Sequence, residues 1–162
     1  MTFAVSVQKI VSGGQTGADR AALDWAIAHG IDHGGWCPRG RRAEDGAIPA
    51  DYRLTETPSD GYAERTEWNV RDADGTVILS VQQSLTGGSK LTAERARQHD
   101  KPCLHLSRAT SGTDAGERLA RFLEAYRIRV LNVAGPRASS EPEIAPFVTE
   151  TLDRALAAPS AG

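Results

Sequence analysis

Three glycine-rich segments of the chain have the composition of turns that bind phosphate. They are Gly13-Gly14-Gln15-Thr16-Gly17-Ala18-Asp19, Leu85-Thr86-Gly87-Gly88-Ser89-Lys90 and Gly135-Pro136-Arg137-Ala138-Ser139-Ser140. Glycine lets a backbone approach a ligand closely, and Ser or Thr hydroxyls contact the ligand or cap a helix. A helix that follows such a turn presents unpaired N–H groups and a positive dipole end, which favour a phosphate or another oxyanion.

The elements that would position these turns alternate between short apolar strands and amphipathic helices. Strands are expected over residues 5–12, 31–36, 76–81, 103–106 and 128–134, and helices over residues 17–29, 62–70, 90–100, 114–126 and 141–157. The run Thr76–Val81 is nearly all apolar, as in a strand that is covered on both faces. The alternation predicts an α/β fold with a parallel sheet of about five strands and helices on both faces.

In such a sheet, right-handed crossovers place the three turns on one edge, at the carboxyl ends of the strands. A single glycine-rich turn is often only a structural need, whereas three on one edge favour a cleft for a small oxyanionic molecule. The candidate binding residues are Gly13, Gly14, Gln15, Thr16, Gly17, Asp19, Thr86, Gly87, Gly88, Ser89, Gly135, Pro136 and Arg137. The GxxxxGK[ST] and GxGxxG fingerprints are absent, which disfavours an ordinary P-loop NTPase or NAD dehydrogenase.

Residues 37–75 do not fit the alternation, because they are rich in Gly, Pro, Arg and acidic residues and show little periodicity. We expect either a lid-like insertion that binds ligand or an excursion that packs on the sheet edge or makes an oligomer contact. Arg39, Arg41 and Arg42 could clamp an oxyanion or lie on a solvated loop. Arg65 and Asn69, on the short helix, could contact a polar ligand or brace the turn.

Length and composition predict a single domain over residues 1–158 with a frayed tail at 159–162. The net charge of −2 disfavours nucleic acid and anionic membrane as partners, and no segment is long and apolar enough to span a membrane. The two cysteines and four histidines have no metal-ligand spacing, so no metal site is expected. These features are typical of a cytoplasmic protein.

The motifs as a set resemble the molybdenum-cofactor carrier family. They are Gly13–Asp19, Gly35–Gly46, Arg65-Thr66-Glu67-Trp68-Asn69-Val70, Thr86-Gly87-Gly88-Ser89 and Asn132-Val133-Ala134-Gly135-Pro136-Arg137, and the likeness extends from about Ile10 to Leu156. The resemblance implies a Rossmann-like fold, related to the lonely-guy phosphoribohydrolases that are also called lysine-decarboxylase-like. It also implies homo-oligomers, molybdenum enzymes as partners, and binding of molybdenum cofactor or of another nucleotide- or phosphate-bearing ligand.

An enzymatic alternative is a nucleoside 5′-monophosphate phosphoribohydrolase. Lonely-guy enzymes carry a GGxGTxxE motif, and Gly87-Gly88 with Glu94 occupies the matching positions, although Lys90-Leu91 replaces the middle Gly-Thr. Glu94 would then serve as the catalytic acid/base or stabilise an oxocarbenium ion, whereas the simpler interpretation is a surface residue that pairs with Lys90 at i,i+4. A third alternative is a nucleotide-sensing module, and whether the chain is an enzyme stays open.

Overall fold

The computed structural model describes residues 7–156, and its centre is a five-stranded parallel sheet. The strand order is β2-β1-β9-β7-β8, with β1 at Lys9–Val11, β2 at Asp32–Gly34, β7 at Gly75–Ser80, β8 at Cys103–Ser107 and β9 at Val130–Ala134. All six residues of β7 are buried, because helices cover both faces of this central strand. The predicted parallel, Rossmann-like α/β sheet is confirmed.

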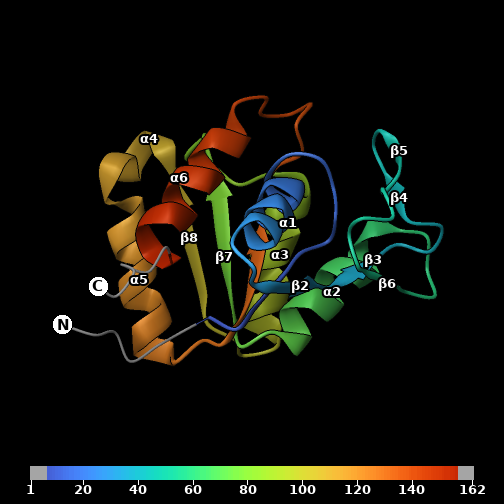
Figure 1. Ribbon diagram of the computed structural model, residues 1–162, viewed down its shortest axis with the longest axis horizontal. Coiled ribbons are helices and arrows are strands. Elements are labelled where there is room, and N and C mark those ends of the chain that lie inside the picture. Colours follow the sequence, from blue (N-terminus) through green and yellow to red (C-terminus); the bar gives the residue numbers. More distant parts are fainter. Residues whose placement is uncertain (1–6, 157–162) are drawn as a thin grey trace.

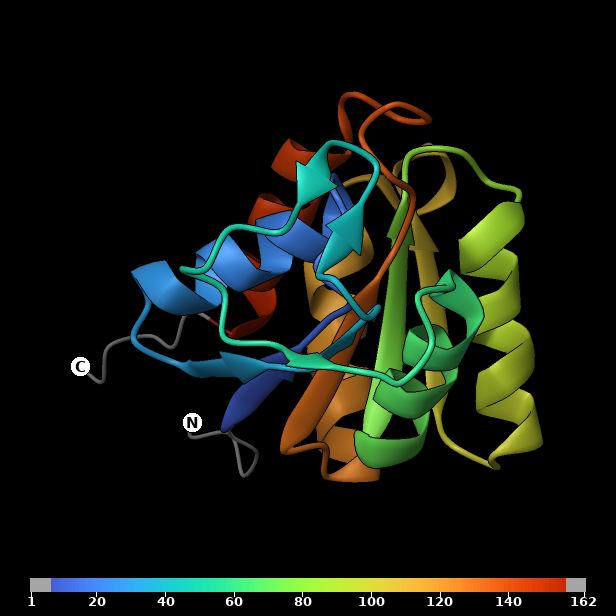
Figure 2. The same ribbon diagram turned by 90° about the vertical axis from the view of Figure 1, so that its right-hand side faces the viewer.

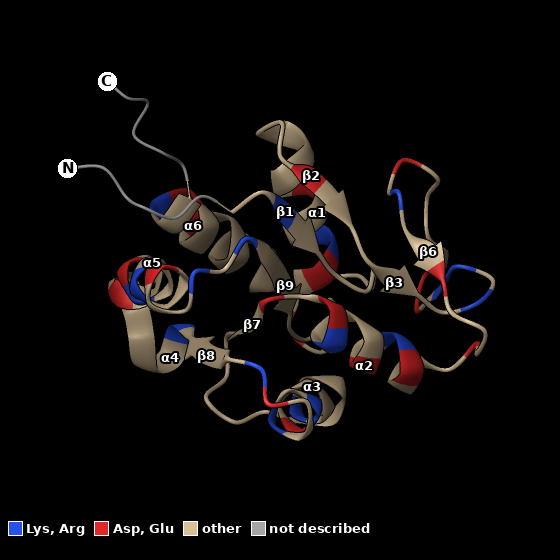
Figure 3. Ribbon diagram, turned by 90° about the horizontal axis from the view of Figure 1, so that it is seen from below, with Lys and Arg blue, Asp and Glu red and all other residues tan. Residues whose placement is uncertain are grey.

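Two layers of helices enclose the sheet (Figures 1 and 3). One layer holds α1 (Ala18–Ala28), α5 (Ala115–Tyr126) and α6 (Ile144–Leu156), and the other holds α2 (Tyr62–Asp72) and α3 (Gly87–Gln98). The core lies mainly between the sheet and the first layer, where Leu119, Leu131 and Leu152 are fully buried. The parallel strands direct their carboxyl ends toward one edge, so the loops that follow β1, β7 and β9 meet there.

Several predicted boundaries are wrong by a few residues, for reasons visible in the structure. The predicted strand over 31–36 is divided at Gly35, whose φ of 123° ends β2 before β3 (Trp36–Cys37) begins. Helix α3 begins at Gly87 and not at Lys90, so the two glycines form its first turn. The last helix begins at Ile144, after Pro142, and a short helix α4 (Arg108–Ser111) with a 3-10 turn (Gly112–Asp114) was not predicted.

The unusual segment at residues 37–75 is folded, and it crosses from β2 to β7 through helix α2. A parallel pair joins β3 to β6 (Thr55–Glu56), and an antiparallel pair joins β4 (Arg42–Ala43) to β5 (Gly46–Ala47). Figure 2 shows this β4–β5 hairpin near the strand-end edge of the sheet. The predicted frayed tail lies outside the described residues.

Candidate functional site

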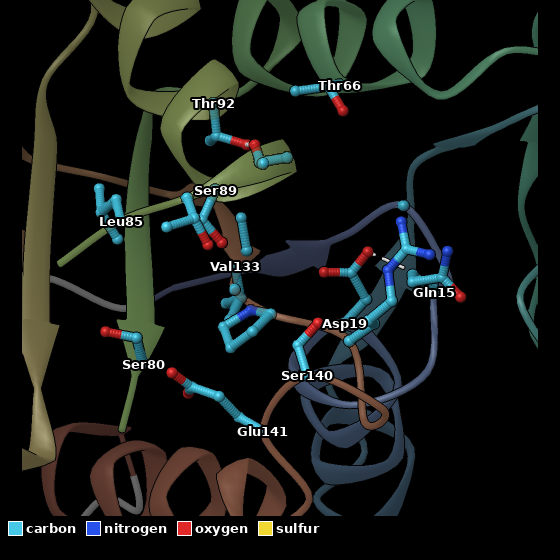
Figure 4. A pocket seen from close by; sticks show the side chains of 18 of the residues that line it. Gln15, Asp19, Thr66, Ser80, Leu85, Ser89, Thr92, Val133, Ser140 and Glu141 are labelled. Atoms are coloured by element: carbon cyan, nitrogen blue, oxygen red, sulfur yellow. Dashed lines mark hydrogen bonds between the residues drawn. The ribbon is translucent and has the colours of Figure 1, made fainter. Parts of the chain in front are cut away.

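The three glycine-rich turns border one cavity at the carboxyl ends of β1, β7 and β9, as predicted. Its volume is about 370 Å³, which is within the range of small-molecule sites. Figure 4 shows it with residues from both helix layers around it. It is lined by Gly13, Gln15, Asp19, Arg65, Thr66, Asn69, Ser80, Ser84, Leu85, Thr86, Gly87, Gly88, Ser89, Thr92, Asn132, Val133, Ala134, Gly135, Pro136, Arg137, Ser139, Ser140 and Glu141.

The backbone N–H groups of the first turn donate hydrogen bonds within the protein, and its side chains Gln15 and Asp19 line the cavity. The N–H of Gln15 donates to Oδ2 of Asp19 at 3.2 Å, and the N–H of Ala18 donates to the carbonyl of Pro136 at 3.2 Å. A Cβ at Gly17 would lie 2.5 Å from that carbonyl oxygen, so only glycine permits this contact between the two turns. Gly14, Thr16 and Gly17 therefore hold the turn together and do not line the cavity.

The third turn is also satisfied largely by the protein. The N–H of Ser139 donates to Oε2 of Glu44 at 3.2 Å, and its hydroxyl donates to Oε1 of the same residue at 2.6 Å. Glu141 reaches back to the end of β7, where its carboxylate accepts the N–H groups of Val81 at 2.6 Å and Gln82 at 3.1 Å. The N–H groups of Val81 and Gln82, which could have bound an oxyanion, are thus already occupied by the carboxylate of Glu141.

The second turn is different, because the start of helix α3 is open to the cavity. No side chain among residues 7–156 caps this helix at Thr86, and a Cβ at Gly87 or Gly88 would meet no atom within 4 Å. Within the first turn, the N–H of Ser89 makes only a 3.2 Å bond to the carbonyl of Thr86. A helix start without a cap leaves donor groups and a partial positive charge directed at the cavity. This turn is the strongest candidate for binding an oxyanion.

A buried ion pair lies at another part of the cavity wall. Asp19 and Arg65 are 7% and 9% exposed, and Nη1 of Arg65 is 3.7 Å from Oδ2 of Asp19. Burial raises the pKa of Asp19 to about 6, although Arg65 opposes the rise. Burial also lowers the pKa of Arg65, an effect that Asp19 opposes. The pair gives this wall a carboxylate and a guanidinium with little access to water.

The predicted arginine cluster does not reach the cavity. Arg41 donates to the carbonyls of Ile48, Pro49 and Tyr52 at 2.7–3.0 Å, and Arg39 donates to the carbonyl of Pro58 at 3.0 Å. These guanidinium groups stabilise the fold of the insertion, where irregular backbone leaves carbonyl groups without a ladder partner.

Asn69 lines the cavity, and its amide also braces the insertion. Its Oδ1 accepts the N–H of Trp36 at 2.8 Å, and its Nδ2 donates to the carbonyl of Trp36 at 2.9 Å. Of the two roles that the sequence left open for Asn69, the structure therefore shows bracing.

Glu94, the candidate acid of the enzymatic alternative, lies outside the cavity. Thr92 lines the cavity, and Glu94 is two residues further along α3, which on a helix is close to the opposite side. The predicted pair with Lys90 is not found among residues 7–156 either, where the ion pairs do not include Glu94.

Several cavity residues were not among the predicted site residues, among them Ser80, Thr92, Asn132 and Glu141. Ser80 is the last residue of β7 and Asn132 lies within β9, two strands whose carboxyl ends form the site. A polar residue within an otherwise apolar strand could have indicated both of them. Oγ of Ser80 is 2.7 Å from Nε2 of His105 and 2.6 Å from the carbonyl of Gln82. Glu141 carried no such signal, because its reach to β7 depends on the tertiary fold. Residues 7–156 contain no group of three or more His, Cys, Asp or Glu side chains arranged to hold a metal ion.

Known proteins resemble this chain along nearly its whole length. Residues 10–156 match the family described as the circularly permutated YpsA SLOG family. The chain belongs to this family. A crystal structure from Syntrophus aciditrophicus, of a protein named "putative molybdenum carrier protein", is 48% identical over 94% of this chain and 96% of that chain, with a TM-score of 0.92. No curated protein matches.

Membership of the SLOG family and the close likeness to that crystal structure confirm the resemblance drawn from the motifs. At 48% identity and a TM-score of 0.92 the two chains share their fold. Within residues 7–156 every helix is too short or too polar to cross a lipid bilayer.

Proposed function

We propose that this protein binds and carries molybdenum cofactor, or a closely related phosphate-bearing molecule, in the cavity at the strand ends. The observation that carries the proposal is the uncapped start of α3, where Gly87 and Gly88 leave open space beside free donor groups. Thr86 and Ser89 line the same part of the wall, and so does Thr92, whose hydroxyl donates to the carbonyl of Gly88 at 2.8 Å. A terminal phosphate bound there would be stabilised by the helix dipole and by the hydroxyls of Thr86 and Ser89.

The charge distribution supports binding of one phosphate in one orientation. Glu44 and Glu141 already occupy the amide groups of the third turn and of the end of β7. Asp19 adds negative charge near the first turn, so a phosphate is favoured at α3 and disfavoured at the opposite wall. Arg137 lines the cavity with a half-exposed guanidinium and adds positive charge at the rim.

A carrier holds its ligand without converting it, and the cavity fits that role better than hydrolysis. The phosphoribohydrolase alternative requires a carboxylic acid near the ligand at the position of Glu94, which is absent from the lining. The name of the 48%-identical protein also supports a role connected with molybdenum. Delivery to molybdenum enzymes, assembly into homo-oligomers and a cytoplasmic location belong to the same proposal.

The proposal is tested by purifying the protein from cells that make molybdenum cofactor and measuring its bound molybdenum and pterin. Elemental analysis gives the metal, and fluorescence of the oxidised pterin gives the organic part. We expect both, in near-equal amounts, with the wild type. Absence of both, together with no thermal stabilisation by added cofactor, would overturn the proposal, because a ligand that binds the folded state must stabilise it.

A matched pair of variants locates the phosphate. Gly88→Asp places a carboxylate in the open space at the start of α3, and Lys90→Gln changes the net charge equally on an exposed side chain of the same helix that does not line the cavity. We expect Gly88→Asp to lose the bound cofactor and Lys90→Gln to keep it. Equal cofactor content in the two variants would contradict phosphate binding at α3.

A further inference from the structure

The wall opposite α3 carries a buried carboxylate whose capacity to accept hydrogen bonds is only partly used. The Asp19 carboxylate is stabilised by the backbone N–H groups of Gln15, which donates to Oδ2 at 3.2 Å, and of Gly13, and among residues 7–156 no side chain donates a hydrogen bond to it. Figure 4 shows the Asp19 carboxylate directed into the cavity, with one oxygen turned away from Gln15. A buried carboxylate is costly unless donors surround it, so a ligand with N–H groups would satisfy it.

Arg65 does not fulfil that need. Its Nη1 donates to the carbonyl of Gly13 at 2.8 Å, and its Nε donates to Oγ1 of Thr66 at 3.2 Å. The separation of 3.7 Å from Asp19 exceeds a hydrogen bond, so the attraction between the two is through space. Burial raises the pKa of Asp19 only to about 6, so the carboxylate is mostly ionised at neutral pH, and it receives no side-chain hydrogen bond from the described residues.

Beside this acceptor lies an amide donor with a fixed orientation. Oε1 of Gln15 accepts the N–H groups of Thr16 at 3.0 Å and Glu44 at 2.9 Å, which places Nε2 on the other side of the amide. Gln15 is only 4% exposed and lines the cavity, and Nε2 has no partner within the described residues. A buried donor without a partner is uncommon in a folded protein and indicates a missing acceptor.

We propose that Asp19 and Gln15 form a subsite for the 2-amino-4-oxopyrimidine ring that guanine and pterins share. One edge of that ring presents two adjacent N–H donors, which match a carboxylate, and a carbonyl oxygen, which matches the amide of Gln15. Adenine lacks this arrangement, and hypoxanthine lacks the amino group. The inference rests on the proposed function, because the same ligand would place its phosphate at α3 and its ring at Asp19.

Calorimetric titration of the purified chain with GMP, IMP and AMP tests the subsite directly, since the three differ only in the base. We expect GMP to bind about tenfold more tightly than IMP, and roughly a hundredfold more tightly than AMP, because hydrogen bonds to a buried carboxylate are each worth about one to two orders of magnitude. A parallel titration compares neopterin with guanosine, which like neopterin carries no phosphate, and distinguishes the sources. Tighter binding of neopterin identifies a pterin, and tighter binding of guanosine identifies a guanine nucleotide, and either supports the subsite.

Asp19→Asn removes the acceptor and nearly preserves the shape, and Asp51→Asn removes the same charge from an exposed loop. We expect the first variant to lose the preference for GMP over AMP and the second to keep it. Equal binding of GMP and AMP by the wild type, or an unchanged ratio in Asp19→Asn, would overturn the inference. A preference for GMP in a protein that carries no molybdenum would refute the carrier function and leave the subsite standing. Molybdenum cofactor bound equally by wild type and Asp19→Asn would refute the subsite and leave the carrier function standing.

Discussion

Replacing Asp19 by Asn should make the protein more stable at neutral pH, although it removes one partner of a buried ion pair. Burial is the largest influence on this carboxyl group and raises its pKa from 3.8 to about 6 in spite of the nearby Arg65. The folded state therefore favours the uncharged form of residue 19 over the charged form, relative to the unfolded chain. Asn resembles the uncharged form and can still accept the N–H of Gln15 through its oxygen.

The size of the effect follows from the difference in pKa between the folded and unfolded states. A rise of about two pKa units corresponds to about 3 kcal/mol, because each unit is worth about 1.4 kcal/mol. A raised folded-state pKa means that the stabilising contribution is complete below pH 3.8 and is lost as the pH rises through 6. The variant should therefore exceed the wild type by about 3 kcal/mol at pH 8 and by about 1.5 kcal/mol at pH 5.

Urea denaturation followed by tryptophan fluorescence at pH 5 and pH 8 measures this difference. Trp25 is 3% exposed in the core, so unfolding changes its surroundings. The charged groups that face Asp19 are Arg65 and Arg20, and both remain protonated over this range. Asp51→Asn serves as the control, and its stability should follow that of the wild type at both pH values. An Asp19→Asn protein that is less stable than the wild type at pH 8 would show that the pairing with Arg65 outweighs the cost of burial.

Three further outcomes are expected. Gly88→Asp should raise the unfolding midpoint by the equivalent of about 1 kcal/mol while it abolishes cofactor binding, because an acidic residue in the first turn of a helix is stabilising; a lowered midpoint in thermal denaturation would contradict this. Glu44→Gln should increase hydrogen exchange in residues 42–47, because its carboxylate joins the β4–β5 hairpin to Thr16 and Ser139; unchanged exchange would refute that role. Glu94→Gln should leave cofactor content unchanged, and chromatography should show no adenine released from AMP by either protein. Adenine release that disappears in this variant would instead identify a phosphoribohydrolase.

The sheet and its strand-end turns could be predicted because their signals are local. The apolar run of β7 and the glycines at the ends of β1, β7 and β9 depend only on neighbouring residues and on the handedness of crossovers. The position of β9 between β1 and β7 could not be predicted, because strand order depends on pairing between segments that are far apart in the sequence. The predicted start of helix α3 is three residues too late, because glycine is a poor helix former and Gly87 and Gly88 therefore do not look like helical residues in the sequence.

The side chains of the site were harder to assign, because their partners are distant in sequence. Arg41 has the composition of an anion clamp, yet its guanidinium is used by three carbonyls of the insertion. Glu141 lies in a loop after β9 and binds amide groups about sixty residues earlier, at the end of β7. Residue type identified which groups could bind an anion, but only the tertiary structure shows which of them are already bound within the chain.

The chain's own carboxylates are what give the cavity a direction. Three strand-end turns with equally free amides would accept a phosphate at any of them, and the ligand would have no fixed orientation. Here the carboxylates of Asp19, Glu44 and Glu141 accept backbone N–H groups and would repel a phosphate at every turn except the start of α3. A single anion-binding position therefore remains. A ligand with phosphate at one end and N–H donors at the other then fits in one orientation only. The negative charges around the cavity therefore select an asymmetric ligand, where uniformly positive walls would have selected any anion.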